Sequence, residues 1–396
     1  MKTPLKGVRV LELTAVLSGP AVGSLMGDLG ADVIKVEPPD GDPVRAWPPY
    51  VRDGQASQYV AFNRSKRGIV LDAKKPSGRE AYLRLAQRAD VIVDNYRHGV
   101  ADRLGIGYEA VRAINPRIIY AVITGFGRTG PKAFDGATDQ VSQAFSGVMS
   151  LNAEPDRAPV RTSTSTSDMG SSLYATIGIL AALRERDRTG QGCLVETSLM
   201  ETHMAFLINH WATLDATGES PKPMGSGTPY LMPYQAYQAK DGFIVIACLT
   251  EKMYASLCEV LGRPDLLSDP RFAINDERVK NRAALNAILD GIVVTYGVKD
   301  LEAKLMAKGV LVTPVNDLKQ VLAEPQVQAR GGLAVMHHPT AGDVQVVRVP
   351  LRFNDEQAGI YGPSPNLGEH SRAVLHEIGY DDAAIERMVA EGATKV

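Results

Sequence analysis

The stretch Val8-Arg-Val-Leu-Glu-Leu13 has the pattern of a β-strand, and Ala31-Asp-Val-Ile-Lys-Val-Glu37 follows it with the same pattern. Residues 14–20 between them are predicted to form a loop, and residues 21–29 are predicted to form a helix. A strand, a helix and a second strand in this order form the unit from which parallel sheets are built. The sequence therefore predicts an α/β fold from its N-terminal part.

Short apolar runs continue this alternation through the first half of the chain. They lie at 68–71, 91–93 and 118–123, with helical patterns at 78–88 and 108–114 between them. We predict a large, doubly wound, Rossmann-like domain with a parallel sheet. Ligands bind such sheets beyond the carboxyl ends of the strands. We therefore expect the functional site in the loops that follow Leu13, Glu37, Leu71, Asp94 and Thr124.

The second half of the chain predicts a smaller domain inserted into the first. Residues 218–229 are rich in glycine, proline and serine, which is typical of a linker. A hairpin pattern and three helical patterns then predict an α+β domain over 230–325. After a second linker at 325–330 we expect the chain to return, so that 1–217 and 330–396 form the large domain. Two crossings would then join the domains.

The composition excludes several classes of protein. The chain has 396 residues, and its 43 Lys and Arg nearly balance 45 Asp and Glu, which argues against a general binder of nucleic acid or membrane surfaces. The three cysteines, Cys193, Cys248 and Cys258, are far apart and fit a reducing compartment. The N-terminus lacks the apolar stretch of a secretory signal, and the longest apolar helical run, 173–183, is too short to span a bilayer. We expect a cytoplasmic protein with no nucleic-acid or membrane partner.

The hydroxyl-rich run Arg161-Thr-Ser-Thr-Ser-Thr-Ser-Asp168 ends in one carboxylate where a helix is predicted to begin. The apolar residues that follow recur at spacings of three and four, which predicts a helix with one buried face. They are Met169, Leu173, Ile177, Leu180 and Leu183. Arginines and then Gly190 mark the helix end. The first turn favours an ionised carboxylate, so Asp168 is either a cap or a catalyst, and the local sequence favours the cap.

Cofactor motifs are weak in this chain. Gly125-Phe-Gly-Arg-Thr-Gly130 has the spacing of a dinucleotide fingerprint, but residues 131–136 leave no room for the helix that should hold the pyrophosphate. We therefore expect no nicotinamide or flavin cofactor. His203 and His210 lie seven residues apart on a predicted helix, which is too far for a pair of metal ligands. No metal site is expected.

A set of short phrases follows one another along nearly the whole chain. They are Leu11-Glu-Leu-Thr14, Ser18-Gly-Pro20, Asp28-Leu-Gly-Ala-Asp-Val-Ile-Lys-Val-Glu-Pro38, Asn63-Arg-Ser-Lys-Arg67, Ala89-Asp-Val-Ile-Val-Asp-Asn-Tyr96, Leu104-Gly-Ile-Gly-Tyr108, Asn115-Pro-Arg-Ile-Ile-Tyr-Ala-Val-Ile-Thr-Gly-Phe-Gly127, Ser167-Asp-Met-Gly170, Pro233-Tyr-Gln-Ala-Tyr237 and Leu367-Gly-Glu-His370. Each phrase alone is weak evidence. In this order they resemble the class III CoA-transferases, the family that includes formyl-CoA and carnitine CoA-transferases and the α-methylacyl-CoA racemases.

The resemblance implies an enzyme that moves CoA from an acyl-CoA to a carboxylic acid, with coenzyme A carried in as the acyl-CoA substrate. Succinyl-CoA or another dicarboxylyl-CoA is our expected donor. The nucleophile would be Asp168, which would form a mixed anhydride and then an aspartyl-CoA thioester. The resemblance also implies an interlocked homodimer, in which ring-shaped subunits pass through each other.

The resemblance further assigns residues to the ligand. The expected CoA contacts are Val16, Ser18, Leu71, Lys74, Asn95, Tyr96, Arg103 and Leu104. Lys74 and Arg103 are suited to phosphates, whereas Leu71, Tyr96 and Leu104 equally suit a hydrophobic core. Thr138 is expected to border the acyl pocket. Gly225 and Gly227 belong to a short version of the glycine loop that shields the intermediate in some members.

Two alternatives stay open on the sequence. Racemases of this fold carry Gly-His-Asp where this chain has Ala137-Thr138-Asp139, and threonine cannot take up a carbon-bound proton. A racemase is therefore the second hypothesis. The third is a CoA-binding protein without catalysis, in which Asp168 only caps its helix.

Overall fold

The computed structural model describes residues 3–396, and its contacts divide the chain into two compact units. The larger unit holds the chain up to Met149 together with Arg161–Glu219 and Arg330–Val396, and the smaller unit holds Ser150–Val160 and Ser220–Ala329. The chain thus passes between the units four times rather than the expected two, because the short segment Ser150–Val160 belongs to the smaller unit. Within residues 3–396 no helix is both long and apolar enough to cross a membrane.

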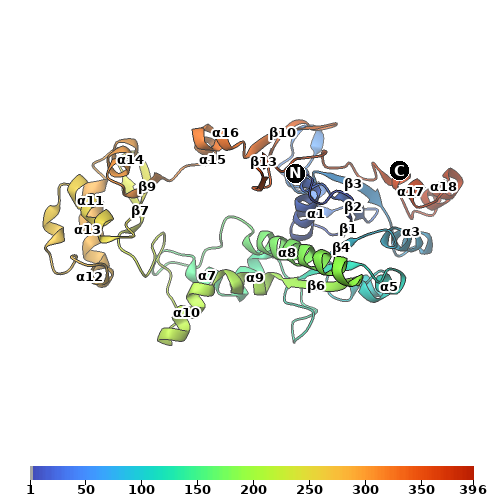
Figure 1. Cartoon of the computed structure of the whole chain (residues 1–396), viewed down its shortest axis with the longest axis horizontal. Helices are drawn as coiled ribbons and strands as arrows, with labels where there is room; N and C mark the ends of the chain where they lie inside the picture. Colours follow the sequence, from blue (N-terminus) through green and yellow to red (C-terminus); the bar gives the residue numbers. More distant parts are fainter. Residues whose placement is uncertain (1–2) are drawn as a thin grey trace. The chain divides into compact units, whose positions relative to one another are not determined.

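The larger unit is built on a six-stranded parallel sheet with the order β3-β2-β1-β4-β5-β6 (Figure 1). The strands are β1 (Arg9–Leu13), β2 (Asp32–Glu37), β3 (Lys66–Val70), β4 (Val91–Asp94), β5 (Ile119–Thr124) and β6 (Cys193–Ser198). In the register of the sheet, Val10 lies opposite Val33 on one side and Val91 on the other. The chain order reverses between β1 and β4, which is the switch point where doubly wound sheets bind ligands. The predicted α/β fold is confirmed.

Helices cover both faces of this sheet. On one face α1 (Ser18–Asp28) and α8 (Thr166–Thr189) pack against the strands, and their core residues include Val22 and Ile179. The other face is covered by α3 (Pro76–Ala86), α5 (Tyr108–Ile114), α17 (Ser371–Glu377) and α18 (Asp382–Ala390). The two C-terminal helices therefore share a core with strands from the N-terminal half, through residues such as Leu375 and Leu11.

The larger unit also holds further helices and two small antiparallel sheets. They are α2 (Ser57–Phe62), α4 (Val100–Arg103), α6 (Asp139–Phe145), α9 (Leu199–Phe206), α10 (Ile208–Thr217), β10 (Leu333–His338), β11 (Gly342–Val347), β12 (Arg352–Phe353) and β13 (Glu356–Gln357). Helix α7 (Val148–Leu151) lies where the chain passes from the larger unit to the smaller one. The smaller unit has an antiparallel sheet of β7 (Tyr234–Ala239), β8 (Gly242–Ala247) and β9 (Leu311–Pro314). Its helices are α11 (Glu251–Val260), α12 (Asn275–Lys280), α13 (Arg282–Val293), α14 (Val298–Ala307), α15 (Leu318–Ala323) and α16 (Pro325–Arg330).

Helix α8 has the predicted length but not the predicted buried face. It ends where Gly190 takes a φ of +76°. The large residues Met169, Leu173, Ile177 and Leu180 are exposed, whereas small residues such as Gly170 and Ala175 are buried. Small side chains allow close packing, since a Cβ on Gly170 would lie 2.5 Å from carbon atoms of Phe206 and Thr202. Of the five residues named from the pattern, only Leu183 is buried.

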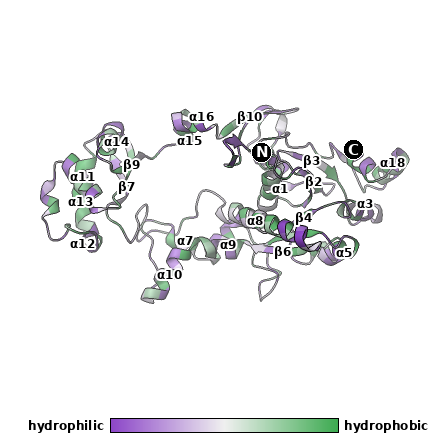
Figure 2. Cartoon of the chain, viewed as in Figure 1, coloured by the Kyte–Doolittle hydropathy of each residue, from purple (hydrophilic) through white to green (hydrophobic). Residues whose placement is uncertain are grey.

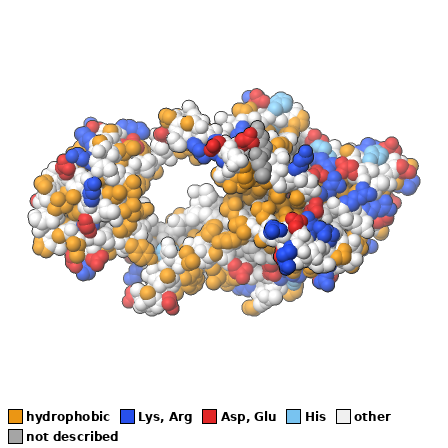
Figure 3. Space-filling model, in the orientation of Figure 1, with side chains coloured by type: hydrophobic (Ala, Val, Ile, Leu, Met, Phe, Trp, Pro, Cys, Tyr) orange, Lys and Arg blue, Asp and Glu red, His pale blue; other side chains and the backbone are white. Residues whose placement is uncertain are grey.

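The uncovered side of α8 forms an apolar surface, and Ile177 is 61% exposed on it. Figure 2 shows hydrophobic residues along α8, with hydrophilic ones gathered toward its C-terminal end. Hydrophobic side chains also gather on this face of the larger unit in Figure 3. Nearby helices α9 and α10 add further exposed apolar side chains, Met204, Phe206, Ile208 and Trp211.

Candidate active site

The loop between β1 and α1 lies at the switch point of the sheet and is held by its neighbours. Ala15 N–H donates to Asn95 Oδ1 at 3.0 Å, and Asn95 Nδ2 donates back to Ala15 O at 2.8 Å. Helix α1 begins at Ser18, three residues earlier than predicted. Val16 takes a φ of +69°. A left-handed conformation is unusual for a β-branched residue, so surrounding contacts must hold this loop in place.

Asp168 lies in the first turn of α8, next to this loop. Ser172 Oγ donates both to Asp168 O at 2.7 Å and to Ser18 O at 2.5 Å, which ties the start of α8 to the start of α1. The Asp168 carboxylate itself makes no hydrogen bond or ion pair with any residue from 3 to 396. An unpartnered carboxylate at a helix start is available for chemistry.

One N–H group at the start of α8, that of Ser167, is used by a second carboxylate, that of Asp139 in α6. Ser167 N–H and Ser167 Oγ both donate to Asp139 Oδ1 at 2.8 Å. Gln143 Nε2 donates to Asp139 Oδ2 at 2.6 Å. Asp139 is buried, so it fixes the first turn of α8 and places a negative charge close to Asp168.

This arrangement corrects the expectation that the helix start keeps Asp168 ionised. Burial, and to a smaller extent the neighbouring charge of Asp139, together raise the pKa of Asp168 to about 7. The physical reason is that Asp139, rather than Asp168, receives the hydrogen bonds of the helix start. Asp168 is therefore poised between its neutral and ionised forms near neutral pH.

His203 in α9 also contacts the first turn of α8, through Thr166, and it contacts α6 through Ser142. Its Nδ1 lies 2.9 Å from Ser142 Oγ and its Nε2 lies 3.0 Å from Thr166 Oγ1. The ring is buried, and burial lowers the pKa of His203, which favours the neutral form. The sequence did not reveal the roles of Asp139 and His203, because their partners come from separate helices.

Two neighbouring cavities open at this edge of the sheet. The first has a volume of about 460 Å³, and its wall includes Leu71, Lys74, Tyr96 and Leu104. The second has a volume of about 340 Å³, and its wall includes Val16, Ser18, Asn95, Tyr96, Thr138 and Asp168. Tyr96 belongs to both walls. The structure thus gathers nine of the twelve sequence-predicted site residues around two adjoining cavities.

Three predicted residues lie elsewhere. Arg103 lies in α4, where its Nη1 would be 3.3 Å from a Cβ on Gly99, and it lines neither cavity. Gly225 and Gly227 lie in the smaller unit, where Gly225 packs against the Glu154 carboxylate. Within residues 3–396, no group of three His, Cys, Asp or Glu side chains is placed to hold a metal ion.

Two basic residues that sequence reasoning missed line the same cavity as Asp168. They are Arg97 and His98. The exposed Arg97 guanidinium has no hydrogen bond or ion pair within residues 3–396. It lies against the backbone of Gly136, where a Cβ would be 2.9 Å from its Nη2. His98 packs on Phe134 with ring centroids 4.8 Å apart. An unpaired cation in the wall is suited to an anionic ligand.

Residues 5–371 match CoA-transferase family III. The chain belongs to this family. It is 36% identical to succinate–glutarate CoA-transferase of Agrobacterium fabrum, over 95% of this chain and 96% of the relative. It is 37% identical to acetyl-CoA:oxalate CoA-transferase of Acetobacter aceti, over 96% and 97%. A crystal structure of a CAIB/BAIF family protein from Brucella suis is 40% identical, with a TM-score of 0.87 over 96% of this chain and all of that one. As a member of CoA-transferase family III, the chain is an enzyme that transfers CoA between an acyl-CoA and an acid.

Proposed function

We propose that this chain transfers CoA from a dicarboxylyl-CoA to a small carboxylic acid through covalent intermediates on Asp168. The observation that carries the proposal is the placement of the Asp168 carboxylate. It has no partner of its own, it lines a cavity at the switch point of the sheet, and a larger cavity adjoins that one through Tyr96. A carboxylate in this setting is suited to attack an acyl carbon.

The proposed reaction has four steps. The Asp168 carboxylate attacks the thioester carbonyl, the C–S bond breaks, and a mixed anhydride and the CoA thiolate form. The thiolate then attacks the aspartyl carbonyl of the anhydride and expels the donor acid, which leaves an aspartyl-CoA thioester. The acceptor carboxylate attacks this thioester to give a second anhydride and free thiolate. Finally the thiolate attacks the acceptor acyl carbon and restores the carboxylate of Asp168.

CoA is proposed to span the two cavities. The first cavity would hold the nucleotide, with Lys74 near the phosphates and Leu71 and Leu104 against apolar parts. The second would hold the thioester beside Asp168, with Val16 and Asn95 in its wall. Arg103 remains a proposed phosphate contact, although it lines neither cavity.

The acid substrate is proposed to be a small dicarboxylate. One carboxylate must react at Asp168, and the second would pair with the free guanidinium of Arg97 in the same cavity. The two relatives described above support this choice, because their names include succinate, glutarate and oxalate, which are dicarboxylic acids.

Replacing Arg97 with methionine should lower kcat/KM for dicarboxylic acids by about 10- to 150-fold. This factor corresponds to the free energy that one charge-assisted hydrogen bond contributes. Monocarboxylic acids of similar length should lose less than about threefold, because they make no such contact. Initial rates with paired mono- and dicarboxylic acceptors measure the difference. Arg112→Met, on the exposed face of α5, is the matched control. Equal losses for both acid classes would contradict the role of Arg97.

The direct test of the function is an exchange assay with the whole protein. Succinyl-CoA is incubated with a panel of mono- and dicarboxylic acids, and new acyl-CoA esters are identified by mass. We expect at least one new dicarboxylyl-CoA with stoichiometric release of succinate. Hydrolysis of succinyl-CoA without any new ester, for every acid in the panel, would reject the proposal.

We also propose that two copies of the chain form a homodimer, interlocked as the family resemblance implies. The apolar surface of α8 supports a partner, because large hydrophobic side chains such as Leu173 and Ile177 are left uncovered by the rest of the chain. Sedimentation equilibrium should give the mass of two chains. Ile177→Asp should weaken that assembly, whereas Val347→Asp on the exposed side of β11 should not. A wild-type monomer at micromolar concentration would contradict this proposal.

A further inference from the structure

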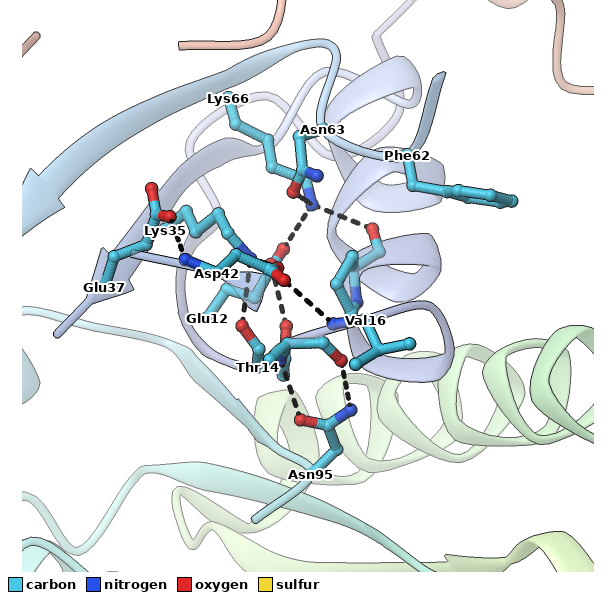
Figure 4. A network of polar contacts seen from close by, with 12 residues as sticks. Glu12, Thr14, Val16, Lys35, Glu37, Asp42, Phe62, Asn63, Lys66 and Asn95 are labelled. Carbon is cyan, nitrogen blue, oxygen red and sulfur yellow. Dashed lines mark hydrogen bonds and ion pairs between the residues drawn. The ribbon is translucent and has the colours of Figure 1, made fainter. Parts of the chain in front are cut away.

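A cluster of buried charges lies against the loop that borders Asp168 (Figure 4). Glu12 in β1 is at its centre. Its Oε1 accepts from Lys35 Nζ at 3.1 Å, and its Oε2 pairs with Lys66 Nζ at 2.6 Å. Lys35 Nζ also lies 3.0 Å from Asp42 Oδ2. Both lysines and Glu12 are fully buried in side chain, so the two positive charges are balanced by two carboxylates away from water.

Helix α1 is shaped to leave room for this cluster. A Cβ on Gly23 would lie 1.8 Å from Glu12 Oε2, and a Cβ on Gly19 would lie 2.3 Å from Thr14 Cβ. The two glycines are four residues apart and so lie on one face of the helix. Their role is therefore to admit a buried carboxylate and the Thr14 side chain against α1.

The cluster reaches the loop through three hydrogen bonds. Lys35 Nζ donates to Thr14 O at 2.9 Å, and Thr14 Oγ1 donates to Glu12 Oε1 at 2.8 Å. Val16 N–H donates to Asp42 Oδ1 at 3.3 Å. In Figure 4 the loop residues Thr14 and Val16 lie between the ion cluster and Asn95. The backbone of the loop is thus held on one side by the charged cluster and on the other by the amide of Asn95.

The hydrogen bond that Asp42 accepts from the loop comes from Val16, the residue whose left-handed conformation needs support. The left-handed conformation of Val16 is disfavoured by about 5- to 30-fold for an L-residue with a side chain, and Asp42 accepts the N–H of that same residue. We propose that the Glu12–Lys35–Asp42–Lys66 cluster positions the 14–18 loop for CoA transfer, and that Asp42 is the positioning residue that holds Val16 in its left-handed conformation. This inference rests on the function proposed above.

A double-mutant cycle between Asp42 and Val16 tests it. Asp42→Ala should lower kcat/KM for CoA transfer by about 5- to 30-fold, because the conformation of Val16 loses its support. In the Val16→Gly background the same change should cost less than about threefold, because glycine adopts a positive φ without penalty. A merely structural role of Asp42 would give the same loss in both backgrounds, and that result would overturn the inference. No loss in either background would also overturn it.

If Asp42→Ala does not fold, two variants at the exposed Val16 test the same inference. Val16→Pro fixes φ near −65° and removes the N–H donor, whereas Val16→Ala keeps both the donor and access to the left-handed region. Val16→Pro should transfer CoA at least about tenfold more slowly than Val16→Ala. Equal rates would overturn the inference. If wild-type protein transfers CoA and only these comparisons fail, the proposed function stands; if wild-type protein neither binds CoA nor transfers it, the proposed function itself fails.

Discussion

Replacing Asp168 with asparagine is expected to abolish CoA transfer, with kcat lowered by at least about 10⁴-fold, as for other covalent nucleophiles. Asparagine has the same shape but cannot donate an electron pair to an acyl carbon as a carboxylate does. The packing around α8 should not change, because the Asp168 side chain makes no hydrogen bond or ion pair within residues 3–396. Steady-state rates and thermal unfolding together measure the two effects.

The matched control is Asp135→Asn. Asp135 lines the same cavity, but its carboxylate is paired with Lys132 at 2.9 Å on the exposed side of the loop. This variant should keep at least about a third of wild-type activity, as expected for an exposed ion pair. More than about one tenth of wild-type transfer by Asp168→Asn would show that Asp168 is not the nucleophile.

The second large effect is the pH dependence of transfer. Burial and the charge of Asp139 raise the pKa of Asp168 to about 7. A raised carboxyl pKa means that the group is neutral below that pH and ionised above it, and only the ionised form attacks. We expect kcat/KM to rise about tenfold per pH unit below pH 7 and to level off above it, a change of about 100-fold from pH 5 to the plateau.

The Asp139→Asn variant tests the cause of that midpoint. Removing the neighbouring charge should move the midpoint to lower pH, whereas burial should keep it above the ordinary value of 3.8 for an aspartate. Asparagine keeps an oxygen that can accept from Ser167 N–H, so the start of α8 should stay in place. Asp135→Asn should leave the midpoint unchanged. A profile that is flat from about pH 5 to pH 8 in the wild type would contradict the raised pKa.

The positions of the strands along the chain and the two ends of α8 could be predicted because each depends on local pattern. Apolar runs marked the strands, and Gly190 marked the end of α8. The buried face of α8 could not be predicted in this way. Its large apolar residues suggested a core, but α8 packs through small residues. Ala175 lies in the core shared with the sheet and α1, and Gly170 lies against α9. A periodic apolar stripe shows that a helix has a face to cover, without showing whether the cover comes from the same chain.

The ion cluster shows a second limit. Glu12 and Lys35 lie inside strands, and each has an apolar residue directly before and after it in the sequence. In a parallel sheet covered on both faces a charged residue at such a position must be buried, so the sequence did hold a signal. Its partners Asp42 and Lys66 come from a loop and from β3. Only the folded sheet shows that these four charges meet.

Asp168 was found by resemblance, and the reason is visible in its surroundings. Its first-turn position alone is typical of a helix cap, yet the capping N–H of Ser167 goes to Asp139. The carboxylates of Asp139 and Asp168 thus both lie at the start of α8, and they have different roles there. Asp139 fixes the turn, and Asp168 is left without a partner beside the cavity.

The most direct test is to trap the intermediate on Asp168. Wild-type protein is incubated with succinyl-CoA and no acceptor, hydroxylamine is added, and the peptide that contains Asp168 is analysed by mass spectrometry. Hydroxylamine nitrogen should attack the aspartyl carbonyl, break the C–S bond and release CoA, which leaves a hydroxamate on Asp168 and an inactive enzyme. Protein incubated with free CoA, and the Asp168→Asn variant, should show no such product. An unmodified Asp168 in protein that still transfers CoA under these conditions would contradict the account.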